Sequence, residues 1–151
     1  MKSWLAALLL SVAIPGVAQT STQVGVSGEV QRELTLRVED LRHRTVVRER
    51  GYGGVRLVDL LQEADIRQDA RHALRRTYVV ATATDGFQAV FSWGELYNTS
   101  VGRGVLVAFE RDSAPLRDGE GQITLVSLAD ERPGTRHVKW LARIEVRRIA
   151  D

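Results

Sequence analysis

The stretch that decides the fold lies at the end of the chain, at Pro133–Ile149, with the sequence PGTRHVKWLARIEVRRI. Its second half alternates, so that one set of side chains points one way and the other set the opposite way: Ile144, Val146 and Arg148 against Arg143, Glu145 and Arg147. Alternation with a period of two predicts a half-buried β-strand. We expect this strand to close the main sheet.

The first half of the stretch gathers three side chains that can donate hydrogen bonds. Arg136, His137 and Lys139 follow the Pro133-Gly134 turn at short spacing. Donors that leave a tight turn can form a concave site for an anion. We therefore expect an anion-binding loop, held to the core by a buried Trp140. The competing interpretation is a solvated basic corner, since charged loops are usually only solvated.

The N-terminal segment has the pattern of a secretory signal peptide. Lys2 gives a positive start, residues 4–14 are mostly apolar, and Gly16–Ala18 supplies small residues for cleavage. The apolar run is shorter than the roughly 20 residues that cross a bilayer. We therefore predict a signal peptide over residues 1–18, a single domain over 19–151, no membrane span after cleavage, and export to the periplasm or the medium.

The composition bounds the chemistry and the partners. The chain has 151 residues and no cysteine, so it forms no disulfide and supplies no thiolate to a metal. Only Lys2 and Lys139 are lysines among its 21 Lys and Arg residues, and the arginines are scattered along the sequence. Nucleic-acid binding would require a concentrated basic stripe with stacking aromatics. We expect no nucleic-acid partner.

Short apolar and alternating segments predict a β-rich domain. Strands are expected at residues 24–30, 34–38, 45–48, 78–84, 87–91, 104–110, 123–126 and 144–149. Most of them follow one another as hairpins, and Asp85-Gly86 is the strongest hairpin signal. The pattern predicts an α+β fold with mixed, mainly antiparallel β-sheets and two or three short helices.

Helical signals are few and short. One amphipathic helix is predicted by apolar residues at helical spacing: Leu57, Leu60, Leu61 and Ala64. Ser92 followed by Glu95 has the form of a capping box and predicts a second helix. We also expect Gly51–Gly54 to be a turn that feeds the first helix, and residues 66–74 to form a further helical piece.

Common catalytic and metal-binding motifs are missing. His43, His72 and His137 show no metal-ligand spacing. The chain contains neither a Gly-x-Ser-x-Gly nor a His-Glu-x-x-His motif. From these residues alone, the chain is a β-rich domain with one candidate anion site and no visible nucleophile.

The order of several motifs nevertheless resembles a known family. The sequence is similar to the molybdopterin-binding domain of the sulfite oxidase family, and most of all to its small exported single-domain members. The resemblance covers nearly all of the chain after residue 18 and rests on these segments: Gly28, Leu34–Leu36, Tyr52–Leu61, Asp85–Phe87, Glu95-Leu96, Val105–Ala108, Pro115-Leu116 and Arg136–Val146.

The resemblance implies a mixed α+β fold with several sheets and a bound molybdenum-pterin cofactor. In the family, the loop before the last strand gives donors to the pterin and its phosphate. Carried over by position, it implies that Arg136, His137 and Lys139 are the cofactor-binding residues. An Arg fork and a Lys ammonium both suit a phosphate.

Two departures from the family pattern limit what the chain can do. Family enzymes bind molybdenum through a cysteine thiolate, a soft ligand that this chain lacks. They also carry a tyrosine just before the loop, where this sequence has Asp130–Pro133. Sulfite-type oxygen transfer by this chain alone is therefore not expected, and we assign no catalytic and no metal-binding residue.

These observations favour an exported, non-catalytic binding module for a small anion, a pterin-like ligand or a protein partner in the periplasm. Two alternatives stay open. One is an oxidoreductase of the sulfite oxidase type that binds molybdopterin without a protein thiolate, in which the cofactor supplies the chemistry. The other is a structural or interaction domain.

Overall fold

The computed structural model describes residues 21–150, so the predicted signal peptide over 1–18 lies outside the described residues. Within 21–150 the strands are β1 (Gln23–Gly28), β2 (Leu34–Arg37), β3 (Val47–Glu49), β4 (Tyr52–Arg56), β5 (Thr77–Ala83), β6 (Gln88–Ser92), β7 (Val105–Arg111), β8 (Ala114–Pro115), β9 (Thr124–Ser127) and β10 (Leu141–Arg148). The helices are α1 (Val38–Arg42), α2 (Leu57–Ala64) and α3 (Trp93–Asn98), with 3-10 turns η1 (Ala73–Arg76), η2 (Ser100–Gly104) and η3 (Asp118–Glu120).

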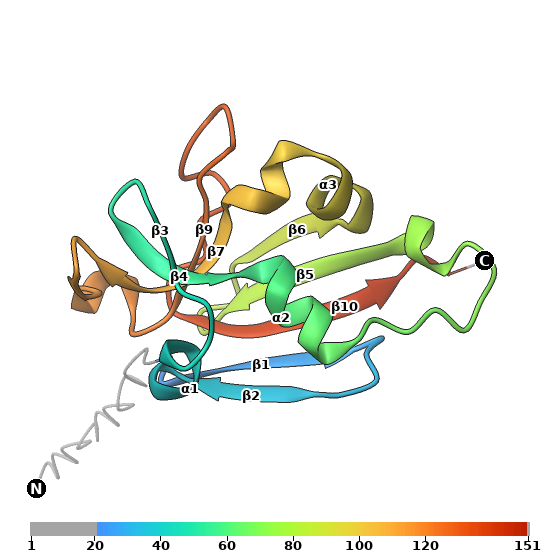
Figure 1. The fold of residues 1–151 in the computed structure, drawn as a ribbon, viewed down its shortest axis with the longest axis horizontal. Coiled ribbons are helices and arrows are strands. Elements are labelled where there is room, and N and C mark those ends of the chain that lie inside the picture. The colour runs from blue at the N-terminus through green and yellow to red at the C-terminus, as the bar shows by residue number, and fades with distance from the viewer. Residues whose placement is uncertain (1–20, 151) are drawn as a thin grey trace, which may run out of the picture.

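The first sheet has the order β2-β1-β10-β5-β6, with the last strand of the chain at its centre (Figure 1). β10 runs parallel to β1 and antiparallel to β5. Its alternation has the predicted sense, since Ile144 and Val146 are buried while Arg143 and Arg147 are exposed. The closing stretch therefore joins the N-terminal hairpin to the central one.

The second sheet has the order β3-β4-β7-β8, and β9 also pairs with β7. Helix α2 contacts strands of both sheets, namely β1, β4 and β7. Its apolar stripe is fully buried: Leu57, Leu60, Leu61 and Ala64 are each 0% exposed. The larger hydrophobic core thus includes residues from β1, β7 and β10, and a second, smaller cluster consists of Leu106, Ala108, Val126 and Leu128.

The predicted fold class is confirmed by this architecture of mixed, mainly antiparallel sheets with three short α-helices in the described part. The Asp85-Gly86 hairpin joins β5 to β6, and Gly86 takes a φ of 90°, where glycine costs little. The Ser92 hydroxyl accepts a hydrogen bond from the Glu95 amide at 3.0 Å, as an N-cap does. Helices α2 and α3 stand where the pattern places them.

Two local predictions were wrong. Residues 52–56 form strand β4 rather than a turn before the helix, because a Cβ at Gly54 would overlap the Val107 carbonyl, and glycine lets β4 approach β7. Residues 66–74 are mostly not helical, since η1 begins only at Ala73. Ile66 instead forms an antiparallel bridge with Val30. In both places long-range pairing overrode local propensity.

Between residues 21 and 150, no helix is both long and apolar enough to cross a membrane.

Candidate functional site

The loop before β10 is held by one buried residue. Val138 is 0% exposed and exchanges two backbone hydrogen bonds with Leu125 of β9, at 2.8 and 2.9 Å. His137 and Lys139 flank Val138 in the chain. The loop is thereby anchored while its polar side chains remain available for other contacts.

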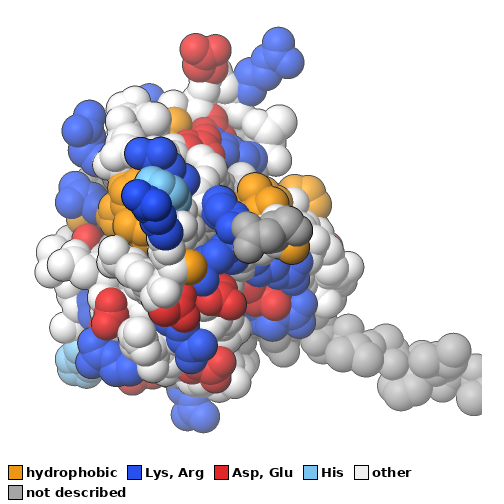
Figure 2. All heavy atoms as spheres, turned by 90° about the vertical axis from the view of Figure 1, so that its right-hand side faces the viewer, with side chains coloured by type: hydrophobic (Ala, Val, Ile, Leu, Met, Phe, Trp, Pro, Cys, Tyr) orange, Lys and Arg blue, Asp and Glu red, His pale blue; other side chains and the backbone are white. Residues whose placement is uncertain are grey.

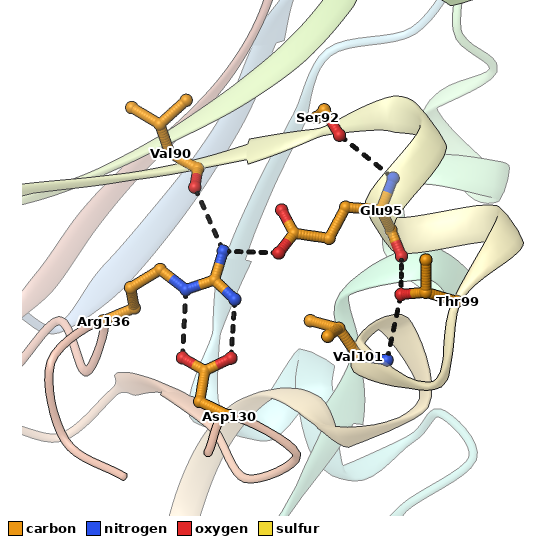
Figure 3. A network of polar contacts seen from close by, with 7 residues as sticks. All are labelled: Val90, Ser92, Glu95, Thr99, Val101, Asp130 and Arg136. Carbon is orange, nitrogen blue, oxygen red and sulfur yellow. Dashed lines mark hydrogen bonds and ion pairs between the residues drawn. The ribbon is translucent and has the colours of Figure 1, made fainter. Parts of the chain in front are cut away.

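Arg136 is fully engaged within the protein (Figure 3). Its Nε and one Nη donate to the two carboxylate oxygens of Asp130 at 3.0 and 2.5 Å. Its other Nη lies 2.8 Å from a Glu95 oxygen and 3.4 Å from the Val90 carbonyl. The guanidinium also lies 4.3 Å above the centre of the Phe91 ring. The side chain therefore ties the loop to β6 and α3.

The charges in this cluster stabilise one another. The hydrogen bond from Arg136 lowers the pKa of Asp130, and the same bond raises the pKa of Arg136. Both groups therefore stay ionised at neutral pH. A bidentate Arg–carboxylate pair is among the stronger side-chain interactions. Arg136 is thus committed to a structural role, and we leave it out of the candidate binding site.

A pocket of about 380 Å³ opens on the other side of the loop. We call it the lysine pocket, and it is lined by Ala83, Asp85 and Phe87 of the β5–β6 hairpin and by Gly134, His137, Lys139 and Trp140 of the loop. The structure therefore brings His137 and Lys139 together in one pocket and turns Arg136 to another surface.

Lys139 is the exposed cation of the lysine pocket. In the part of the chain that the structure describes, its ammonium makes no hydrogen bond and no ion pair. Asp85 also lines the pocket, where its carboxylate accepts from the Phe87 amide at 3.0 Å. Phe87 is 47% exposed, so an apolar ring face stands near the lysine.

Trp140 was expected to be buried but is only half-buried, and it lines the lysine pocket. All three of its polar groups are bonded: its amide to the Glu120 carbonyl at 2.9 Å, its carbonyl to the Thr84 amide at 3.0 Å, and its indole N–H to the Asp118 carbonyl at 3.2 Å. Its φ of 49° is unfavourable for an aromatic residue, and such strain is often found at functional sites. The ring is therefore fixed in place at the pocket.

His137 lies deeper than Lys139. Burial lowers the pKa of its imidazole below the ordinary value of 6.5, so the ring is neutral at pH 7. Its Nε2 is buried without a hydrogen-bond partner. The ring of Tyr52 meets it edge-on, with centroids 6.2 Å apart. At neutral pH, Lys139 is therefore the residue that gives the pocket positive charge.

Behind His137 lies a polar cluster that the sequence did not indicate. The Tyr52 hydroxyl donates to Glu120 at 3.2 Å, and Arg111 donates to the same oxygen at 3.2 Å. The Arg111 guanidinium also lies 5.0 Å from the centre of the Tyr52 ring. Burial raises the pKa of Tyr52, so the phenol keeps its proton. Tyr52 and Glu120 stand 68 positions apart, and no local pattern joins them.

The surface charge is mixed on the face that Figure 2 shows. Lys and Arg side chains lie there among Asp and Glu, rather than in a single stripe. The expectation that no nucleic acid binds stays a prediction.

The residues present do not fit a thiolate-bound molybdenum centre. The chain has no cysteine, and no group of three His, Asp or Glu side chains among residues 21–150 could hold a metal ion. The organic part of such a cofactor is a different matter, because a flat anion matches an unpaired ammonium beside aromatic rings. If it were bound, the chain's own residues would hold and orient it at the lysine pocket.

Comparisons with known proteins also point to a molybdopterin-binding domain. The model of the oxidoreductase molybdopterin binding domain matches residues 45–150. Among solved structures, the chain is similar to the sulfane dehydrogenase SoxCD from Paracoccus pantotrophus, with a TM-score of 0.64 and 18% sequence identity. That match covers 86% of this chain but only 39% of the other, so the chain spans well under half of its length. No curated protein matches. The resemblance to a molybdopterin-binding domain is thus confirmed, and the chain belongs to the family of oxidoreductase molybdopterin-binding domains.

Proposed function

We propose that this chain is a non-catalytic member of its family, which binds a small flat anion, such as a pterin carrying an acidic group, in the lysine pocket. The observation that carries the proposal is Lys139, an exposed ammonium without an acidic partner in the described residues, at a pocket of about 380 Å³. Phe87 and Trp140 line the same pocket. An ammonium is a point charge suited to an anion, and ring faces favour a flat ligand.

The non-catalytic part of the proposal rests on the ligand chemistry of the chain. A thiolate is the protein ligand that the family resemblance requires, and the sequence supplies none. His137, which is neutral at pH 7 because burial lowers its pKa, and Trp140, whose polar groups are all bonded, would shape and orient a ligand. The proposal assigns neither of them a chemical step.

The test is a titration of the purified protein with pterin-6-carboxylate and, separately, with inorganic phosphate, followed by calorimetry and tryptophan fluorescence. Lys139→Gln is expected to weaken binding about tenfold, which corresponds to ~1.4 kcal/mol. Arg103→Gln is the matched control, because it removes the same charge from an exposed side chain outside the pocket. Its affinity should equal that of the wild type.

Three outcomes would overturn parts of the proposal. Equal affinities of Lys139→Gln and wild type would exclude the lysine pocket as the binding site. Stoichiometric molybdenum in protein made by a host that produces the cofactor would support the oxidoreductase alternative. Absence of binding to both probes would favour an interaction domain, for which the stacked and partly exposed Trp93 and Tyr97 offer a surface, with ring centroids 5.0 Å apart.

We also propose that the domain acts after export, because Lys2, the apolar run 4–14 and the small residues up to Ala18 have the pattern of a signal peptide. Mass spectrometry of the processed protein should find Gln19 as the first residue. An N-terminus at Met1 in the mature protein would refute export by this route.

A further inference from the structure

We propose that His137 makes anion binding in the lysine pocket acid-dependent: its protonation adds a second positive charge beside Lys139, so that affinity rises as the pH falls. This inference rests on the proposed function, namely that the lysine pocket binds an anion. It names a regulator of that site that the family assignment does not contain.

The geometry places the imidazole where a proton would act on the ligand. His137 and Lys139 flank Val138, whose backbone is paired with Leu125. Both line the pocket. A charge on His137 would therefore act on the same bound anion as the Lys139 ammonium.

The ring has one nitrogen ready to receive the proton. Nε2 of His137 is buried without a hydrogen-bond partner. Tyr52, which packs edge-on against the ring, donates to Oε1 of Glu120, and Oε2 of Glu120 is likewise buried without a partner. It is the one carboxylate oxygen in that condition within residues 21–150. The negative charge of Glu120 raises the pKa of His137 and so favours the imidazolium, whereas burial opposes it.

The groups around the ring set the pH at which it acts. Burial lowers the pKa of His137 most, and the positive charge of Lys139 lowers it further, whereas Asp130 and Glu120 raise it. Tyr52 faces the ring and stays neutral, because burial raises its pKa. Asp85 faces the pocket from the β5–β6 hairpin. The balance leaves His137 neutral at pH 7 and places its charging on the acidic side of 6.5.

A bound anion must raise the pKa of His137. A negative charge in the pocket offsets the repulsion from Lys139 and favours the imidazolium. Because linkage is reciprocal, an anion that promotes proton uptake binds more tightly when the proton is present. Binding should thus strengthen below pH 6.5 and level off once His137 is charged.

Sulfate is the suitable probe, because it keeps its double charge throughout this range, unlike phosphate. Its affinity is measured by calorimetry from pH 8 to pH 5 for the wild type, for His137→Gln and for His43→Gln. We expect the wild type to bind about tenfold more tightly at pH 5.5 than at pH 7.5, the equivalent of one pKa unit. His137→Gln should show a flat profile, and His43→Gln, an exposed histidine outside this pocket, should follow the wild type.

The outcomes separate the two proposals. Sulfate binding that does not vary with pH in the wild type would overturn the role of His137 and leave the lysine pocket standing. Absence of binding of both sulfate and pterin-6-carboxylate at every pH would overturn the proposed function and this inference with it. If His137→Gln fails to fold, the wild-type His137 resonance is titrated by NMR with and without sulfate. Sulfate should raise its pKa, and an unchanged titration would overturn the inference.

Discussion

Arg136 and Lys139 stand three positions apart in one loop and have opposite roles. Arg136 bonds both oxygens of Asp130, pairs with Glu95 and covers the ring of Phe91. Lys139 has no acidic partner in the described residues and faces an open pocket. In the sequence both are basic residues after a Pro-Gly turn. What distinguishes them is the position of acceptors elsewhere in the fold.

The difference follows from the two sides of the loop. One side meets β6 and α3, which supply the Val90 carbonyl and the Glu95 carboxylate, and a planar guanidinium can satisfy several such acceptors at once (Figure 3). The other side meets the Asp85-Gly86 turn, whose carboxylate is already bonded to the Phe87 amide. The cation on the first side, Arg136, is therefore paired within the protein, whereas Lys139 on the other side has no acidic partner among the described residues.

The largest expected effect is the loss of stability when Arg136 is removed. Arg136→Ala should lower the free energy of unfolding by about 3 kcal/mol, since it leaves two carboxylates without their cation. Asp130 suffers most, because its side chain is only 10% exposed. Urea denaturation measures the change. Lys139→Ala is the control and should stay within ~0.5 kcal/mol of the wild type, as exposed substitutions do.

A result in which both variants lose the same stability would show that the two cations are equivalent, and our division of the loop would be wrong. A small loss for Arg136→Ala alone would restore Arg136 as a candidate ligand donor.

Much of the fold could be predicted from the sequence because its signals are local. Alternation in the closing strand, the α2 stripe and the Asp85-Gly86 turn each depend on neighbouring residues. Strand β4 could not be found in this way. Its glycines look like a turn, and only the approach of Val107, far along the chain, explains Gly54.

The site was predictable only in part for the same reason. The motif order pointed to the loop that carries His137 and Lys139, but not to which of its donors were already bonded within the protein. The partner of Arg136 in α3 lies 41 positions away, at Glu95. The contact between Tyr52 and Glu120 spans 68 positions. Pairing between distant polar groups leaves no periodic trace, so a sequence shows the donors without showing their acceptors.

A smaller effect is expected for the coupling energy between each cation and a neighbouring carboxylate, which a double-mutant cycle measures. Asp130→Ala and Arg136→Ala, alone and combined, should give a coupling of about 2 kcal/mol, because contacting charged pairs interact within the range of roughly 0.5–3 kcal/mol. The parallel cycle of Asp85→Ala with Lys139→Ala should give a coupling below ~0.5 kcal/mol, since both side chains are exposed and neither pairs with the other. Comparable couplings in the two cycles would contradict the division of roles.

The smallest expected effect concerns the pH dependence of stability in the absence of any ligand. Burial lowers the pKa of His137 in the folded state, so the unfolded chain binds more protons near and below pH 6.5. Stability should therefore fall as the pH drops below 6.5. The opposite window belongs to Asp130, whose lowered pKa contributes stability that is present above 3.8 and is lost only as the pH falls through the folded value.

These two windows can be separated by thermal unfolding of the wild type and His137→Gln at pH values from 7.5 to 3. Between pH 7.5 and pH 5 the wild type should lose stability and the variant should lose less, whereas below pH 3.8 both should lose stability together. Addition of sulfate at pH 5.5 should restore the wild type more than the variant, because a bound anion favours the charged imidazole. The contrary result is a stability difference between the wild type and His137→Gln that is the same at pH 5 and at pH 7.5. It would mean that burial does not lower the pKa of His137, and the contrast between a buried His137 and an exposed Lys139 would be wrong.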